Sequence, residues 1–134
     1  HLVPERFSLI RPYKGTRQAI EAIRQRGITI TALSDMPPQN KLKSLGLDDL
    51  FDFKLCTEDW GVLKPHQRAF DGIIQTIRIQ PSEILYVGNN VEYDILGAKK
   101  AGMRAALRGR QNSDADLSFS NWEELTEWVV KHID

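Results

Sequence analysis

Short apolar runs alternate with helical patterns along most of the chain. The segment RQAIEAIRQR (17–26) places isoleucines on one face, and Gly27 follows it where a helix usually ends. The next run, ITITAL (28–33), is rich in β-branched residues, carries no charge, and stops shortly before two prolines. Strands without a polar face are typical of parallel sheets that are covered on both sides. This pair of segments therefore predicts an α/β fold.

The same alternation continues to the end of the chain. Further strands are predicted at FKLC (53–56), ILYV (84–87), RAAL (104–107) and early in DLSFSNWEELTEWVVKHI (116–133), which also holds the last helix. Other helices are predicted at QNKLKSLG (39–46), around the apolar residues Phe70, Ile73, Ile74 and Ile77, and at EYDILGAKKAG (92–102). Strands joined by helices imply right-handed crossovers. The sequence therefore predicts one domain with a three-layer, doubly wound parallel sheet.

The last helix carries a start signal of its own. Asn121 and Glu124 have the spacing of a capping box, in which each side chain accepts a hydrogen bond from the backbone of the other. Trp122, Leu125 and Val129 share one face of this helix, so we expect them in the core.

The composition excludes several classes of function. Lys+Arg and Asp+Glu each number 18, and like charges are not clustered, so neither nucleic acid nor a membrane is an expected partner. No apolar run approaches the roughly 18 residues of a membrane span, and no signal peptide is recognisable, so we expect a cytoplasmic protein. Cys56 is the single cysteine, which excludes an intramolecular disulfide and favours a reducing compartment.

Polar residues follow three of the predicted strands. Ser34 comes directly after ITITAL, Lys64 lies in the loop after FKLC, and Asn89 follows ILYV. Each has an ordinary structural explanation, because serine and asparagine are common in turns and lysine is usually solvated. Ligands of doubly wound sheets, however, bind beyond the carboxyl ends of the strands. A hydroxyl, a cation, and oxygen ligands near Asn89 and Asp94 together suit a phosphoryl group with Mg²⁺.

Three segments resemble the motifs of a known family. ITITALSD, GVLKPHQRAF and ILYVGNNVEYDILGAKKAGM are similar, in order and spacing, to motifs II, III and IV of the haloacid dehalogenase-like hydrolase superfamily. The resemblance covers residues 12 to about 107 and is to the branch with an inserted helical cap. It implies that 1–134 is one segment of a Rossmann-like core domain, in which 1–14 enters from an absent cap region and 15–134 forms the core.

The resemblance also implies an activity and roles for individual residues. Most members are Mg²⁺-dependent phosphatases that form an aspartyl phosphate, and a minority are dehalogenases that need no metal. Ser34 and Asp35 would bind the phosphoryl group of a small phosphorylated substrate, and the catalytic residue Lys64 would balance the charge of nucleophile and phosphate. Asn89 and Asp94 would belong to the Mg²⁺ site.

The chain departs from the family pattern at three places. Motif I, a strand ending in Asp-x-Asp that supplies the nucleophile, is absent from it. Asn89 stands where the family usually has aspartate, so the affinity for metal should fall. Asp35 stands where the family often has asparagine, and its charge would repel a phosphate unless the carboxylate points away or is paired.

The absent strand has a consequence for the fold. In the family it lies between the strands of motifs II and IV, so its absence would leave two rows of backbone hydrogen-bonding groups unpaired. Three explanations stay open: the strand is encoded upstream of His1, another chain supplies it, or the remaining strands close up. Unpaired edges also favour a homodimer or a complementing upstream segment as partner.

Three functions stay open on the sequence. The first is a phosphatase for a small phosphomonoester whose nucleophile is not in this chain. The alternative is a catalytically inactive binding or scaffold domain, which Asn89 and Asp35 favour. The third, a flavodoxin-like or receiver-type signalling domain, would need an acidic cluster after the first strand, where the sequence has Ser34 and Asp35 alone.

Overall fold

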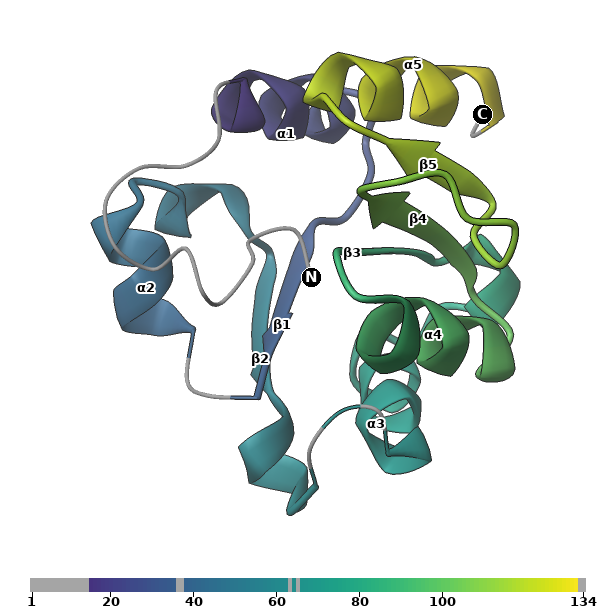
Figure 1. The fold of residues 1–134 in the computed structure, drawn as a ribbon. Helices are drawn as coiled ribbons and strands as arrows, with labels where there is room; N and C mark the ends of the chain where they lie inside the picture. The colour runs from purple at the N-terminus through teal and green to yellow at the C-terminus, as the bar shows by residue number, and fades with distance from the viewer. Residues whose placement is uncertain (1–14, 36–37, 63, 65, 133–134) are drawn as a thin grey trace.

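The computed structural model describes residues 15–35, 38–62, 64 and 66–132 (Figure 1). Its α-helices are α1 (Thr16–Arg24), α2 (Gln39–Ser44), α3 (Gln67–Ile77), α4 (Leu96–Lys100) and α5 (Trp122–His132). Its strands are β1 (Thr31–Ser34), β2 (Phe53–Cys56), β3 (Leu85–Gly88), β4 (Arg104–Arg108) and β5 (Leu117–Phe119). Shorter helical segments are η2 (Asp48–Leu50), η3 (Thr57–Trp60), η4 (Pro81–Glu83) and the π-helix η5 (Val91–Ile95). The predicted alternation is confirmed, whereas the predicted cap entry at 1–14 lies outside the described residues.

The described strands are all parallel, and they form two sheets. β1 pairs with β2 in the register Thr31↔Phe53 to Ser34↔Cys56, while β4 lies between β3 and β5. Within the described part of the chain, no strand pairing joins β1 to β3. The predicted parallel α/β fold is therefore confirmed, with its sheet divided at this point. The explanation in which the remaining strands close up does not hold for these residues.

A cavity of about 300 Å³ lies between the two sheets. Mainly apolar side chains line it, among them Ile30 and Leu33 on the β1 side, Leu85 and Val87 on the β3 side, and Ile73 and Leu125 from helices. The facing edges of β1 and β3 each lack a strand partner among the described residues. The division of the sheet is thus an apolar gap and not a polar surface.

Apolar side chains pack on both faces of the strands. One core cluster contains Ile20 of α1 and residues of α2 and α5, and the other contains Phe70 of α3 and residues of α4. Neighbouring strand residues enter opposite clusters, as Ala32 and Leu33 of β1 do. Figure 1 shows α1 and α5 together on one side and α3 and α4 on the other. The three layers explain why the strands lack an alternating polar pattern.

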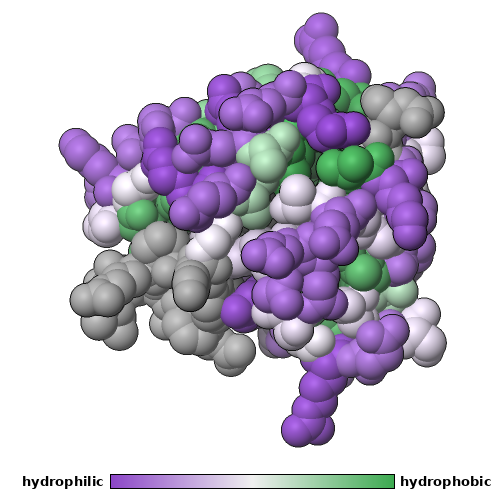
Figure 2. Space-filling view, turned by 90° about the horizontal axis from the view of Figure 1, so that it is seen from above, coloured by the Kyte–Doolittle hydropathy of each residue, from purple (hydrophilic) through white to green (hydrophobic). Residues whose placement is uncertain are grey.

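The outer side of α1 and α5 forms a largely hydrophilic surface. Figure 2 views the molecule from this side and shows hydrophilic residues over much of it, with small hydrophobic areas between them. The predicted capping box of α5 is present, because Asn121 Oδ1 accepts from the Glu124 amide at 3.0 Å and Glu124 Oε1 accepts from the Asn121 amide at 3.3 Å. No helix in the described residues is long and apolar enough to cross a membrane.

Gly97 of α4 lies against the buried ring of Phe70 from α3. A Cβ atom at position 97 would overlap this ring, so Gly97→Ala should lower the free energy of unfolding by about 1–3 kcal/mol through overpacking. Urea denaturation measures the loss. Lys100→Ala, at an exposed position of the same helix, is the control and should change stability by less than about 0.5 kcal/mol. An unchanged Gly97→Ala protein would show that the ring can move aside.

Asp116 joins the start of β5 to α4 and β4. Its carboxylate accepts hydrogen bonds from the Ala105 amide at 2.7 Å and from Lys99 Nζ at 2.9 Å. Partial burial acts to raise the pKa of Asp116, but these two donors outweigh it and hold the pKa below the ordinary value of 3.8. Because the folded-state pKa is the lower one, the carboxylate stabilises the fold above about pH 4 and loses this effect as the pH falls.

Asp116→Asn is therefore expected to unfold at a lower urea concentration than the wild type at neutral pH. The difference should shrink when the same titration is repeated at an acidic pH below 3.8, where protonation of the wild-type carboxyl group begins to remove its stabilising effect. A difference of equal size at both pH values would mean that the charge of Asp116 does not stabilise the fold.

Candidate functional site

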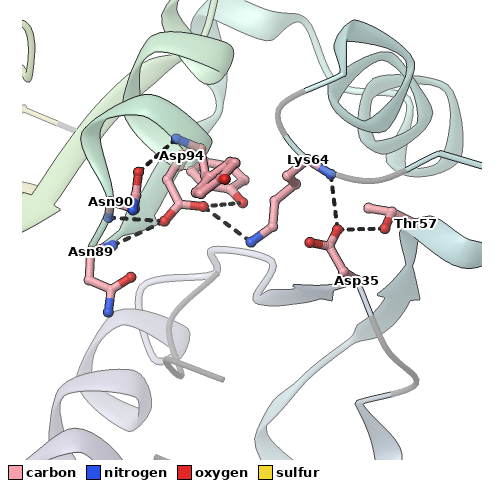
Figure 3. Close-up of polar contacts among 8 residues, drawn as sticks. Asp35, Thr57, Lys64, Asn89, Asn90 and Asp94 are labelled. Atoms are coloured by element: carbon pink, nitrogen blue, oxygen red, sulfur yellow. Dashed lines mark hydrogen bonds and ion pairs between the residues drawn. The ribbon is translucent and has the colours of Figure 1, made fainter. Parts of the chain in front are cut away.

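The residues predicted for the site follow strands that end at one edge of the two sheets (Figure 3). Ser34 is the last residue of β1 and Asp35 follows it. Asn89 directly follows β3, and Asp94 lies in η5 a few residues later. Lys64 lies in the loop between η3 and α3. Because the strands are parallel, their carboxyl ends meet at this edge, where ligands of such sheets bind.

An ion pair between Lys64 and Asp94 forms the centre of the site. The Lys64 Nζ atom lies 3.2 Å from Asp94 Oδ1, and the two side chains are only 6% and 4% exposed. Burying two charges is costly unless they are paired and further hydrogen-bonded. The hydroxyl of Tyr86 supplies a further bond by donating to Asp94 Oδ1 at 3.3 Å. The cation of Lys64 is therefore held at a defined position.

The loop after β3 holds the second oxygen of the same carboxylate. The backbone amides of Asn89 and Asn90 both donate to Asp94 Oδ2, at 3.2 Å each. The Asn90 side chain accepts in turn from the Tyr93 amide at 2.8 Å. These bonds wrap the loop around the carboxylate, and the chain passes through a π-helix before α4 begins. π-helical turns of this kind are frequent at functional sites.

Gly88 leaves room for the side chain of Asp94. A Cβ atom at position 88 would overlap the Cβ atom and the carboxylate of Asp94. Gly88 is the last residue of β3, and it is not one of the described glycines that have a positive φ. The glycine is thus needed because two parts of the chain approach closely, and not because of a special turn conformation.

The predicted metal ligands, Asn89 and Asp94, lie close together in the chain fold. In Figure 3 the Asn89 side chain extends away from the Asp94 carboxylate, which accepts hydrogen bonds from Lys64, Tyr86 and two backbone amides. Among the described residues there is no group of three or more His, Cys, Asp or Glu that could hold a metal ion. Amide and carboxylate oxygens are nevertheless the ligand type that Mg²⁺ prefers. Their role as ligands stays a prediction.

The carboxylate of Asp35 is paired. Its Oδ1 atom accepts a hydrogen bond from the Thr57 hydroxyl at 2.6 Å and another from the backbone amide of Lys64 at 3.1 Å. Both donors are neutral groups, so these bonds fix the orientation of the carboxylate. Ser34, one residue earlier, is 3% exposed. The assignment of Ser34 and Asp35 to phosphate binding stays a prediction.

Two residues of the site are not among those predicted from the sequence. Thr57 directly follows β2, so the rule that identified Ser34 and Asn89 would also have identified Thr57 if it had been applied to FKLC. Tyr86 gives no such signal, because it lies inside an apolar strand and looks like an ordinary core residue. Its hydroxyl reaches Asp94 through the packing of η5 against β3.

The polar contacts form one connected chain across the divided sheet. Asp35 follows β1 and binds the backbone of Lys64, whose ammonium group binds Asp94 beyond β3. Figure 3 shows Lys64 between the two carboxylates. The edge where β1 and β3 lack strand pairing is thus bridged by side chains at its carboxyl end.

Comparison with known proteins places this geometry in a family. A glyceraldehyde 3-phosphate phosphatase of Pyrococcus furiosus is 26% identical over 132 residues, which are 96% of this chain and 54% of the relative. A pyrimidine 5′-nucleotidase of Escherichia coli is 35% identical over 131 residues, which are 90% of this chain and 58% of the relative. The chain thus spans a little over half the length of these curated relatives.

The fold is also similar to that of a solved structure. The crystal structure of a haloacid dehalogenase-like phosphatase from Thermococcus onnurineus superposes with a TM-score of 0.81 at 29% identity, covering 88% of this chain and 58% of that one. Residues 3–102 match the family model for haloacid dehalogenase-like hydrolases. Because this match covers most of the chain and the fold agrees with it, the chain belongs to the haloacid dehalogenase-like hydrolase family.

Proposed function

We propose that this chain is the carboxyl-terminal core segment of a Mg²⁺-dependent phosphatase that acts on small phosphomonoesters. The observation that carries the proposal is the buried cation of Lys64, held by residues that follow both β1 and β3. A fixed ammonium group at the carboxyl edge of a parallel sheet is suited to attract a phosphoryl group and to offset its negative charge. The buried hydroxyl-bearing residue Ser34 ends the neighbouring strand and supplies a further phosphate ligand.

The nucleophile of the proposed reaction comes from outside this chain. The gap between β1 and β3 is apolar and has a free strand edge on each side among the described residues, which suits an inserted parallel strand. Such a strand would end beside Lys64. An aspartate there attacks phosphorus and releases the substrate alcohol, and water then hydrolyses the acyl phosphate to inorganic phosphate. The chain's share of its relatives' length agrees with a complementing segment.

Mg²⁺ would be held at the loop after β3. The amide oxygen of Asn89 and, through water, the engaged carboxylate of Asp94 are the ligands that this chain offers. When bound there, the ion would supply positive charge to offset the negative charge of the phosphate oxygens. Because Asn89 is neutral, tight binding also requires carboxylates from the complementing strand.

The substrate class follows from the relatives. The names of those relatives give a triose phosphate and pyrimidine 5′-nucleotides as substrates, and both are small phosphomonoesters. We assign the same broad class to this protein.

A catalytically inactive binding domain is the second candidate. It is favoured by the four hydrogen bonds that Asp94 accepts and by the neutral Asn89. This candidate predicts a protein that keeps its fold but has no hydrolytic activity when the complementing strand is present.

Lys64→Met is expected to lower strongly the activity of the longer protein that contains an Asp-x-Asp strand. Loss of a preorganised cation at the phosphoryl group should lower kcat/KM for p-nitrophenyl phosphate with Mg²⁺ by about 10²–10³-fold. Lys43→Met, at an exposed position of α2, is the control and should retain full activity. If the longer wild-type protein is inactive, the result would favour the catalytically inactive binding domain.

Asn89→Asp is expected to strengthen the binding of Mg²⁺. A carboxylate adds a negative charge where the loop offers a neutral amide, so the Mg²⁺ concentration for half-maximal activity should fall by about tenfold. Isothermal titration calorimetry on the same two proteins measures the affinity directly. Asn90→Asp tests whether charge in the loop alone is enough, and it should have the smaller effect because the Asn90 side chain caps η5. Equal affinities of wild type and Asn89→Asp would remove Asn89 from the metal site.

A further inference from the structure

We propose that Asp35 is a positioning residue for Lys64. Its carboxylate fixes the backbone of the loop that carries the lysine, and thereby sets where the ammonium group lies between the two sheets. Asp35 acts through Lys64 and not by touching the reacting atoms. This positioning depends on hydrogen bonds within the chain and does not require the proposed phosphatase activity.

The loop is attached to the end of β1 at Lys64 itself. Asp35 Oδ1 accepts from the Lys64 amide at 3.1 Å, whereas the amides of Gly61 and Val62, earlier in the loop, bond back to Glu58 and Thr57. The first described residues after Lys64 already belong to the start of α3. The bond to Asp35 thus anchors the described part of the loop between η3 and α3 to the end of β1.

Asp35 is itself held in place. Thr57, which is 0% exposed, donates its hydroxyl to the same Oδ1 atom at 2.6 Å. Thr57 directly follows β2, and Cys56 before it pairs with Ser34 of β1. The carboxylate therefore gathers the ends of β1 and β2 and the loop into one unit, with hydrogen bonds that its charge makes strong.

Lys64 is consequently fixed at both ends of its side chain. Asp35 holds its backbone, and Asp94 holds its ammonium group at 3.2 Å with 6% of the side chain exposed. A lysine side chain has four rotatable bonds and loses considerable entropy when it is ordered. Anchoring the backbone restricts the remaining freedom, so that the ion pair to the other sheet forms in one geometry.

Chemical labelling of lysine tests this directly. Acetylation with an N-hydroxysuccinimide ester, followed by peptide mass spectrometry, gives the rate at Lys64 relative to exposed Lys43 in each variant. Asp35→Ala should raise this relative rate about tenfold, because loss of the anchor lets the loop open locally. Asp35→Asn keeps an acceptor oxygen for both donors and should stay within about twofold of wild type. Asp59→Ala, which removes an exposed carboxylate from η3, is the matched control.

Amide hydrogen exchange of Lys64 supplies a second readout. Its exchange rate should rise about tenfold in Asp35→Ala and remain near the wild-type rate in Asp35→Asn and Asp59→Ala. Unchanged labelling and exchange of Lys64 in a folded Asp35→Ala protein would overturn the inference. So would an equal increase in Asp59→Ala, because it would show that any charge lost nearby loosens the loop.

A further variant covers the case in which Asp35→Ala does not fold. Thr57→Val keeps the bond from Asp35 to the Lys64 amide but removes the hydroxyl that holds the carboxylate. It should raise the exchange rate of the Lys64 amide about threefold. No change at Lys64 in a folded Thr57→Val protein would then overturn the inference. Both readouts report on the lysine itself, so a protein without phosphatase activity tests the proposal equally well.

Discussion

The buried ion pair of Lys64 and Asp94 is the interaction on which the site depends. Its two charges are almost wholly removed from water, and each oxygen of the carboxylate is satisfied by two donors. Removing one partner of such a pair typically costs about 3–5 kcal/mol, because the other charge is left buried and unpaired. The surrounding sequence follows from this. Gly88 leaves space for the carboxylate, and the loop after β3 turns its amides inward.

The divided sheet gives this ion pair a second role. Between β1 and β3 the described residues offer an apolar gap without strand pairing, while the helices on both faces keep the two halves in a common three-layer arrangement. At the carboxyl edge, Asp35, Lys64 and Asp94 connect the halves by polar contacts. The family resemblance predicts Asp35 and Lys64 at a phosphate site and Asp94 at a Mg²⁺ site, so the bridge coincides with the candidate site.

Local patterns made most of the elements predictable. FKLC coincides with β2, the apolar residues around Phe70 identify α3, and the capping box marks the start of α5. Errors arose where distant contacts decide. β1 begins at Thr31, three residues into the predicted run, because its partner β2 begins opposite that residue. The other difference is local: the helix predicted from residue 92 begins as a π-helix at Val91, and within it Asp94 accepts from the amides of Asn89 and Asn90.

The order of the residues is enough to predict the fold class and the family, since both rest on apolar periodicity and on short motifs whose spacing is local. It also indicated which residues would gather at one edge of a parallel sheet. The tertiary structure alone decided how they bond: that Asp35 turns to Thr57 and the backbone of Lys64, that Asp94 takes the ammonium group, and that Tyr86 joins them from within a strand. The physical reason is that buried charges select their partners by three-dimensional proximity and desolvation, neither of which is written in the order of residues along the chain.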